Sequence, residues 1–248
     1  MSFSYTGLAF LLGFFAVGLL SYRFFQYWQK EKTVVSKVFF CFAATFALFM
    51  IITAIGGLFF AENTQVLRWV VILAALIQSF GFAFIAYLIF YLKFPRISPW
   101  WGSVVVFLLG LTTTFLTAIT PFSPYLEASG GINWDIQHNQ PLVDVFRFFL
   151  FLITFLPLIV ILVQQVKVSA DPKIKARAFG LGVVMAFGVL ISLLDFLLET
   201  ILKLGAISSD IAMSVFGVVV LILIIFTQRP PKKEEEEYVS PSSGRISW

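Results

Sequence analysis

VFFCFAATFALFMIITAIGGLFF, residues 38–60, is an apolar stretch without a single charged side chain. An α-helix of about 20 such residues is long enough to cross the hydrocarbon core of a bilayer. The strands of a membrane barrel are shorter and alternate between apolar and polar residues, so this stretch does not fit a barrel. It therefore predicts a transmembrane α-helix.

Six more runs of the chain have the same apolar character. They cover about residues 5–22, 69–92, 100–119, 145–163, 178–198 and 211–227. The whole sequence is 60% hydrophobic and 12% charged, and the charged share is about half that of a soluble domain. We therefore expect an all-α membrane protein, a bundle of seven transmembrane helices over residues 1–228 that lies in the lipid bilayer of the cell membrane.

The basic residues indicate how the chain is oriented in the membrane. If the N-terminus is outside, all but three of the 17 Lys and Arg residues fall on the inner side, and the exceptions are Arg68, Arg147 and Lys203. Inner loops of membrane proteins carry this excess of positive charge. Met1–Tyr5 has no basic residue, so the first run does not begin like a cleaved signal peptide. We expect the N-terminus outside and the C-terminus in the cytoplasm.

Two polar segments interrupt or follow the apolar runs. The longest loop covers residues 120–144 on the outer side, and its Ser129-Gly130-Gly131 sequence is typical of a turn. We expect this loop to fold over the mouth of the bundle. The tail, residues 229–248, contains four consecutive Glu residues and is expected to be a disordered cytoplasmic segment.

Small residues recur every four positions in the run 178–198, at Ala178, Gly182 and Ala186. On a helix this spacing places them on one face, where small side chains let a neighbouring helix approach closely. We interpret the stripe as a packing surface.

Several activities of membrane bundles need residues that this sequence lacks. The one His, His138, lies in the long outer loop, so it cannot supply the axial ligands of a haem or the two His of a zinc peptidase. The run 211–227 has no Lys to bind retinal. There is no glycine-rich phosphate loop and no basic face interleaved with aromatic residues. We expect no enzyme activity, no metal, no cofactor and no nucleic acid.

Ionisable residues inside an apolar run are costly and therefore indicate function. Asp195 and Glu199 are four residues apart and share one face of their helix. Arg147 lies near the outer start of the run 145–163, three residues after Asp144. Two interpretations remain open. In the first, these residues pair with one another at the headgroup level and have only a structural role at the helix ends. In the second, they line an outward-facing cavity that binds a small polar ligand or a proton. In both, Arg147 and Asp195 approach each other.

The layout of the chain resembles the N-terminal seven-helix sensor module of bacterial histidine kinases. The resemblance covers about residues 5–228. It rests on the outer loop that opens with Thr120-Pro121 and contains Gly130-Gly131, and on residues 177–198 with their small residues and late acidic residue. It implies an outward-facing, non-enzymatic sensor in a bacterial inner membrane. Such modules usually precede an output domain, whereas here about 20 residues follow the last run, so the signal would pass to a separate partner protein.

Two other functions stay open, a small transporter and an accessory subunit of a membrane complex. A kinase or response-regulator gene beside this one would favour sensing. An ATPase or permease gene would favour transport.

The distribution of basic residues predicts the topology. Reporter fusions after Lys32, Lys93, Lys173 and Lys233 should read as cytoplasmic, because loops rich in Lys and Arg stay inside. Fusions near Asn63, Ser129 and Ser208 should read as external. Paired phosphatase and fluorescent-protein reporters measure this directly. A cytoplasmic Ser129 would reverse the whole orientation.

Overall fold

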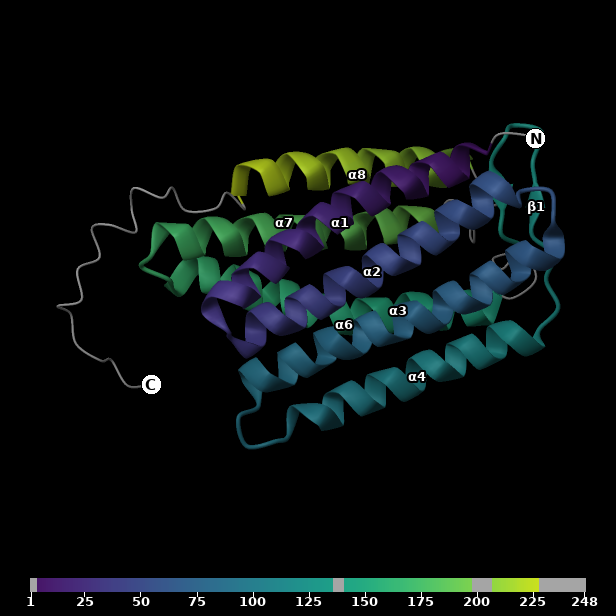
Figure 1. Ribbon diagram of the computed structural model, residues 1–248. Helices are drawn as coiled ribbons and strands as arrows, with labels where there is room; N and C mark the ends of the chain where they lie inside the picture. Colours follow the sequence, from purple (N-terminus) through teal and green to yellow (C-terminus); the bar gives the residue numbers. More distant parts are fainter. Residues whose placement is uncertain (1–3, 136–140, 198–206, 228–248) are drawn as a thin grey trace.

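The protein is an all-α bundle in a computed structural model that describes residues 4–135, 141–197 and 207–227 (Figure 1). Seven helices occur in these ranges: α1 Tyr5–Glu31, α2 Val34–Phe59, α3 Thr64–Lys93, α4 Pro99–Ile119, α6 Pro141–Val168, α7 Pro172–Asp195 and α8 Ile207–Thr227. Six of them are long and apolar enough to cross a membrane, and α8 contributes the shorter apolar segment Ser214–Ile225. The prediction of an all-α, multi-pass membrane protein is confirmed. The predicted tail, residues 229–248, lies outside the described ranges.

Most of the helices extend beyond the apolar runs that predicted them. The apolar run measures only the part of a helix within hydrocarbon, whereas the backbone hydrogen bonds continue until a residue caps them. Ser4 caps α1, Thr33 caps α2 and Asn63 caps α3, each accepting a hydrogen bond from the backbone N–H three residues later. At its other end α1 stops at Lys32, whose left-handed φ of 54° turns the chain into α2.

The helices form a closed bundle in chain order. Each helix packs against the next one, α6 also contacts α3, and α8 returns to pack against α1. Figure 1 shows α8 running alongside α1 at one edge of the bundle. Phenylalanine side chains fill much of the interior, with Phe24 stacked on Phe39, and Phe42 and Phe82 each edge-on to Phe155. These contacts join α1, α2, α3 and α6 in one core.

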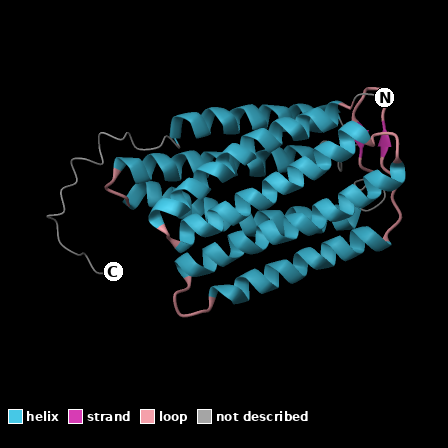
Figure 2. Ribbon diagram, viewed as in Figure 1, coloured by secondary structure: helices cyan, strands magenta, loops and turns pink. Residues whose placement is uncertain are grey.

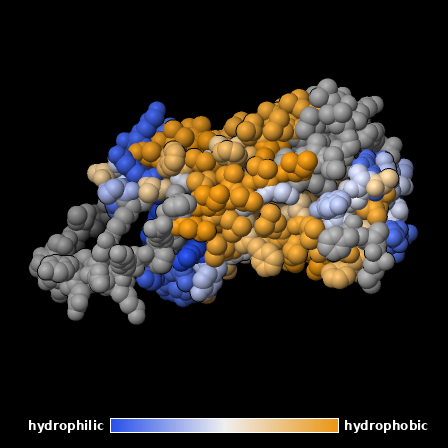
Figure 3. All heavy atoms as spheres, turned by 90° about the horizontal axis from the view of Figure 1, so that it is seen from above, coloured by the Kyte–Doolittle hydropathy of each residue, from blue (hydrophilic) through white to orange (hydrophobic). Residues whose placement is uncertain are grey.

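The two ends of the bundle differ in sequence and structure. One end holds Ser4, the turn between α2 and α3, and a small β-hairpin. Figure 2 shows the two strands of this hairpin in magenta. The opposite end holds the turns that follow α1, α3 and α6. That end also gathers most of the basic residues with described side chains: Lys30, Lys32, Lys37, Lys93, Arg96, Lys167, Lys175 and Arg177. Figure 3 shows hydrophobic atoms along the middle of the molecule and hydrophilic atoms towards both ends.

Glycine allows a close backbone contact between helices, but at a different place from the predicted stripe. A Cβ atom on Gly57 would lie 2.8 Å from the Cα atom of Gly7, so α1 and α2 meet there backbone to backbone. In the stripe, Ala178 and Gly182 are buried, yet a Cβ atom on Gly182 would meet only Leu162 at an ordinary 3.5 Å. Ala186 is exposed. Of the predicted stripe, only Ala178 and Gly182 are therefore in the packed interior, and Ala186 faces the outside of the bundle.

The two glycine environments predict opposite responses to one substitution. Gly57→Ala should lower the free energy of unfolding by about 1–3 kcal/mol, since the added methyl group has to push two backbones apart. Gly182→Ala should leave stability unchanged or raise it by up to ~1 kcal/mol, because alanine is the better helix former and the site has room. Thermal unfolding of both variants in one detergent compares them. An unchanged melting temperature in Gly57→Ala would show that α1 and α2 do not meet at this point.

Candidate functional site

The described part of the long loop forms an antiparallel hairpin. Its strands are β1 Tyr125–Leu126 and β2 Ile132–Asn133, with Leu126 opposite Ile132. The turn is closed by a hydrogen bond of 2.8 Å from the Glu127 N–H to the Gly131 carbonyl. Gly130 takes a φ of 85°, which favours glycine, so the turn predicted from Ser129-Gly130-Gly131 is confirmed.

The hairpin is anchored to the start of α1 and to the turn between α2 and α3. The Tyr5 N–H donates to the Gly130 carbonyl at 2.9 Å, and the Ile132 N–H donates to the Thr6 Oγ1 atom at 2.7 Å. The Ile132 side chain is fully buried against Ala61 and Leu67. The expectation that this loop folds over one end of the bundle is confirmed for its described residues.

Aromatic side chains continue this cover into the bundle. Trp134, just after β2, lies edge-on to Phe10 at 6.5 Å, and Phe10 lies edge-on to Phe49 at 5.8 Å. Arg68 of α3 has its guanidinium 5.4 Å from the ring of Phe122 and donates to the Ala118 carbonyl at 3.0 Å. That carbonyl is in the last turn of α4, where a cation is favourable to the helix dipole. Arg68 therefore has a structural role at the end of α4.

Arg147 makes a polar contact between α6 and α3. Its Nη2 atom donates to the Oε1 atom of Gln78 at 3.2 Å, and both side chains are half-buried. Asp144 lies in the first turn of α6 and is also half-buried. A carboxylate there is favourable to the positive end of the helix dipole, by about 0.3–1 kcal/mol. These residues provide a cation and a carboxylate in the first two turns of α6 and an amide in the middle of α3.

The other two predicted site residues are described less fully. Asp195 is the last residue of α7, but its side chain lies outside the described atoms, and so does all of Glu199. The ends of α6 and α7 do meet, because Phe148 stacks on Phe196 with ring centroids 4.6 Å apart. Each of these rings is next in sequence to one member of the predicted pair. The approach of Arg147 to Asp195 stays a prediction.

Gln78 was not among the residues predicted for this site. It is the one amide side chain in the apolar run 69–92. An amide at such a position needs a hydrogen-bond partner, since lipid offers none. That argument could have marked Gln78 from the sequence, but only the packing of α3 beside α6 shows that Arg147 is its partner.

A cavity of about 80 Å³ lies in the middle of the bundle. Phe151 and Phe155 of α6, one and two helical turns after Arg147, form part of its wall. The rest of the wall comes from α1, α2, α7 and α8: Val17, Leu20, Phe42, Ala43, Phe46, Met50, Val184, Met185, Gly188, Ile191, Ser192, Phe216 and Val220. At roughly 24 cal/mol per Å³ of void, an empty cavity of this size costs on the order of 2 kcal/mol.

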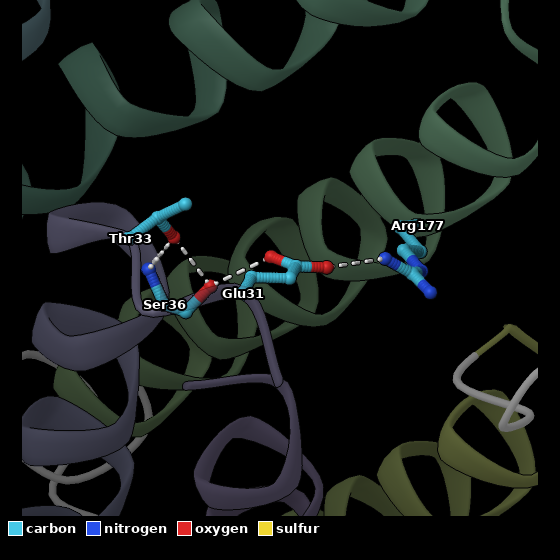
Figure 4. Close-up of polar contacts among 4 residues, drawn as sticks. All are labelled: Glu31, Thr33, Ser36 and Arg177. Atoms are coloured by element: carbon cyan, nitrogen blue, oxygen red, sulfur yellow. Dashed lines mark hydrogen bonds and ion pairs between the residues drawn. The ribbon is translucent and has the colours of Figure 1, made fainter. Parts of the chain in front are cut away.

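The basic end has its own polar cluster, shown in Figure 4. Glu31, the last residue of α1, accepts from Arg177 of α7 at 3.4 Å and from the Ser36 hydroxyl of α2 at 3.0 Å. The guanidinium of Arg177 also lies 4.2 Å from the centre of the Tyr27 ring. The ion pair is 33% and 42% exposed on its two side chains, so its contribution is at most about 1 kcal/mol. Its geometric effect is to tie the ends of α1, α2 and α7 together.

No protein-family model matches the chain, and no curated protein matches it in sequence. Within the described ranges, no three His, Cys, Asp or Glu side chains come together as a group that could hold a metal ion. Function is therefore inferred from the polar site at Arg147.

The contact between Arg147 and Gln78 predicts a loss of stability when the amide is removed. Gln78→Leu should lower the free energy of unfolding by about 1–3 kcal/mol, because a half-buried cation loses a hydrogen-bond acceptor. Gln164→Leu is the matched control, since exposed Gln164 accepts from Lys93 at the surface and its loss should cost under about 1 kcal/mol. Chemical or thermal unfolding of the two variants measures the difference. Equal effects would show that Gln78 does not hold Arg147.

Proposed function

We propose that this protein is an outward-facing seven-helix sensor of a bacterial inner membrane that signals through a separate protein. In this proposal α8 is the seventh crossing, the hairpin end is outside, and the chain ends in the cytoplasm. The gathering of basic residues at the end opposite the hairpin supports the orientation. The hairpin covers the other end of the bundle. A ligand from outside would have to pass beside this hairpin to reach the bundle.

The half-buried Arg147, held by Gln78, is the observation that carries this proposal. An Arg side chain within a membrane helix is costly, and such residues usually face a bundle interior with a functional partner. Asp144, Asp195 and Glu199 would complete the site. Together these groups suit a small polar or ionisable ligand, or a proton shared between carboxylates.

A signal from this site would reach the cytoplasm along α7. That helix has 24 residues, so it spans about 36 Å at a rise of about 1.5 Å per residue. It carries Asp195 at one end and, near the other, Arg177, which pairs with Glu31 of α1. A shift or rotation of α7 on ligand binding would change this exposed ion pair at the basic end, where a cytoplasmic partner would bind. Because the pair contributes little stability, it can break and re-form at low cost.

The proposal is tested by Arg147→Gln, Asp195→Asn and the double variant in a bacterial host that lacks the gene. Each single change should alter the same transcripts as the deletion while membrane levels of the protein stay at wild type. Gln164→Leu is the control and should leave the transcripts unchanged. Sequencing of cellular RNA and quantitative blotting measure the two quantities.

Two outcomes would contradict the proposal. If both single changes lower the melting temperature, the double change recovers part of the loss, and the transcripts do not change, the residues only finish the helix ends. If the variants instead change the uptake of a solute into proteoliposomes while the transcripts stay constant, the protein is a transporter.

A further inference from the structure

Three aromatic rings form a cluster where α1 and α2 meet at the basic end of the bundle. Trp28, in the last turn of α1, stacks on Phe40 of α2 with ring centroids 5.8 Å apart, and Phe25 lies edge-on to Trp28 at 6.0 Å. Phe25 is 37% exposed, whereas Trp28 and Phe40 are half-buried. The cluster is therefore on the outside of the bundle, where lipid can reach it.

The length of α1 indicates how deep this cluster lies in the membrane. The helix has 27 residues, which span about 40 Å at a rise of about 1.5 Å per residue. The hydrocarbon core of a bilayer is about 30 Å thick, so the ends of α1 reach the headgroup layers. Trp28 is in its last turn and lies at the edge of the hydrocarbon, where tryptophan is enriched in membrane proteins.

Lys32 and Lys37 place two positive charges beside the ring of Trp28. Their Nζ atoms lie 5.7 and 5.9 Å from the ring centroid, and both side chains are exposed. Within the described ranges neither lysine forms an ion pair, because the adjacent carboxylate of Glu31 pairs with Arg177 of α7 instead. The two ammonium groups are thus open to an anion from outside the protein.

Lys32 also occupies a backbone position that glycine would take with less strain. Its φ of 54° and ψ of 21° are left-handed, and in this region the Cβ atom of any other residue crowds the following carbonyl. A residue that ends a helix in this conformation is usually glycine. A lysine here keeps a cation beside Trp28 at a cost in backbone energy, which is a reason to look for a function of its side chain.

We propose that this cluster binds the headgroup of an anionic phospholipid, with the phosphodiester at Lys32 and Lys37 and the glycerol backbone against Trp28. A phosphodiester shares one negative charge between two oxygen atoms, which can accept hydrogen bonds from both ammonium groups. A zwitterionic headgroup such as phosphatidylcholine brings its own cation towards the two lysines and is disfavoured. The proposal rests on the membrane location of the bundle and not on the proposed sensor function.

Titration of the full-length protein with lipid tests this site. The protein is immobilised in detergent and titrated with phosphatidylglycerol or phosphatidylcholine that carries tritium in one acyl chain. The wild type should bind phosphatidylglycerol at least fivefold more tightly. Lys32→Gly and Lys37→Gln should each weaken binding of phosphatidylglycerol about fivefold, because a basic residue near the membrane surface attracts anionic lipid. Binding of phosphatidylcholine should stay constant.

Lys32→Gly separates a loss of binding from a loss of folding. Glycine takes the left-handed conformation without steric cost, so the melting temperature should stay at the wild-type value or rise while lipid binding falls. The matched controls are Lys93→Gln and Lys175→Gln, which each remove one exposed charge from the same end. In the described structure neither of these lysines lies over an aromatic ring, and both variants should bind phosphatidylglycerol within twofold of the wild type.

Three results would overturn the proposal. Equal binding of the two lipids by the wild type would show that the cluster does not select an anionic headgroup. An equal loss in the control variants would show that the lipid responds to the overall charge of this end and not to a site at Trp28. Displacement of bound phosphatidylglycerol by inorganic phosphate, compared with chloride at matched ionic strength, would assign the site to a free anion.

Discussion

Backbone amides and carbonyls have no hydrogen-bond partner in hydrocarbon, and this constraint explains most of the structure. Each crossing has to satisfy its own backbone, which an α-helix does and an open strand does not. Buried hydroxyls follow the same rule: Ser79 and Thr117, for example, bond to the carbonyl of the residue four positions earlier in their own helix. The strands of the described chain occur only in the hairpin beyond the helix ends.

Lipid surrounds the helices with hydrocarbon, so burial of apolar area does little to bring them together. Close contact between surfaces has to do this instead. Gly7 and Gly57 let α1 and α2 touch at their backbones, and the phenylalanine rings of α1, α2, α3 and α6 fill the interior. Against this dense packing, the central cavity is an exception. A void forfeits the contacts that hold such a bundle together.

Two groups of polar side chains bond between helices, and α7 runs from one group towards the other. At the basic end, Arg177 of α7 joins Glu31 at the end of α1. At the hairpin end, the end of α7 meets α6 through Phe148 and Phe196, next to the contact between Arg147 and Gln78. The ion pair at the basic end is exposed and weak, whereas the hairpin end is held by buried contacts such as Ile132. If the protein is the proposed sensor, this exposed ion pair is the contact that a shift of α7 would change.

The sequence by itself determined the class of the protein, because apolar runs without charge can satisfy their backbones in lipid only as helices. It also located the helices, the turn at Gly130 and the segregation of basic residues, since these depend on neighbours in the chain. It named Arg147 as a site residue from the cost of burying its charge. Only the tertiary structure decided which surfaces meet: that Gln78 receives Arg147, that Gly57 rather than Gly182 makes the close helix contact, and that five helices enclose a cavity. A helix that is apolar all round carries no periodic signal for its neighbour, so these pairings follow from how the surfaces fit in three dimensions.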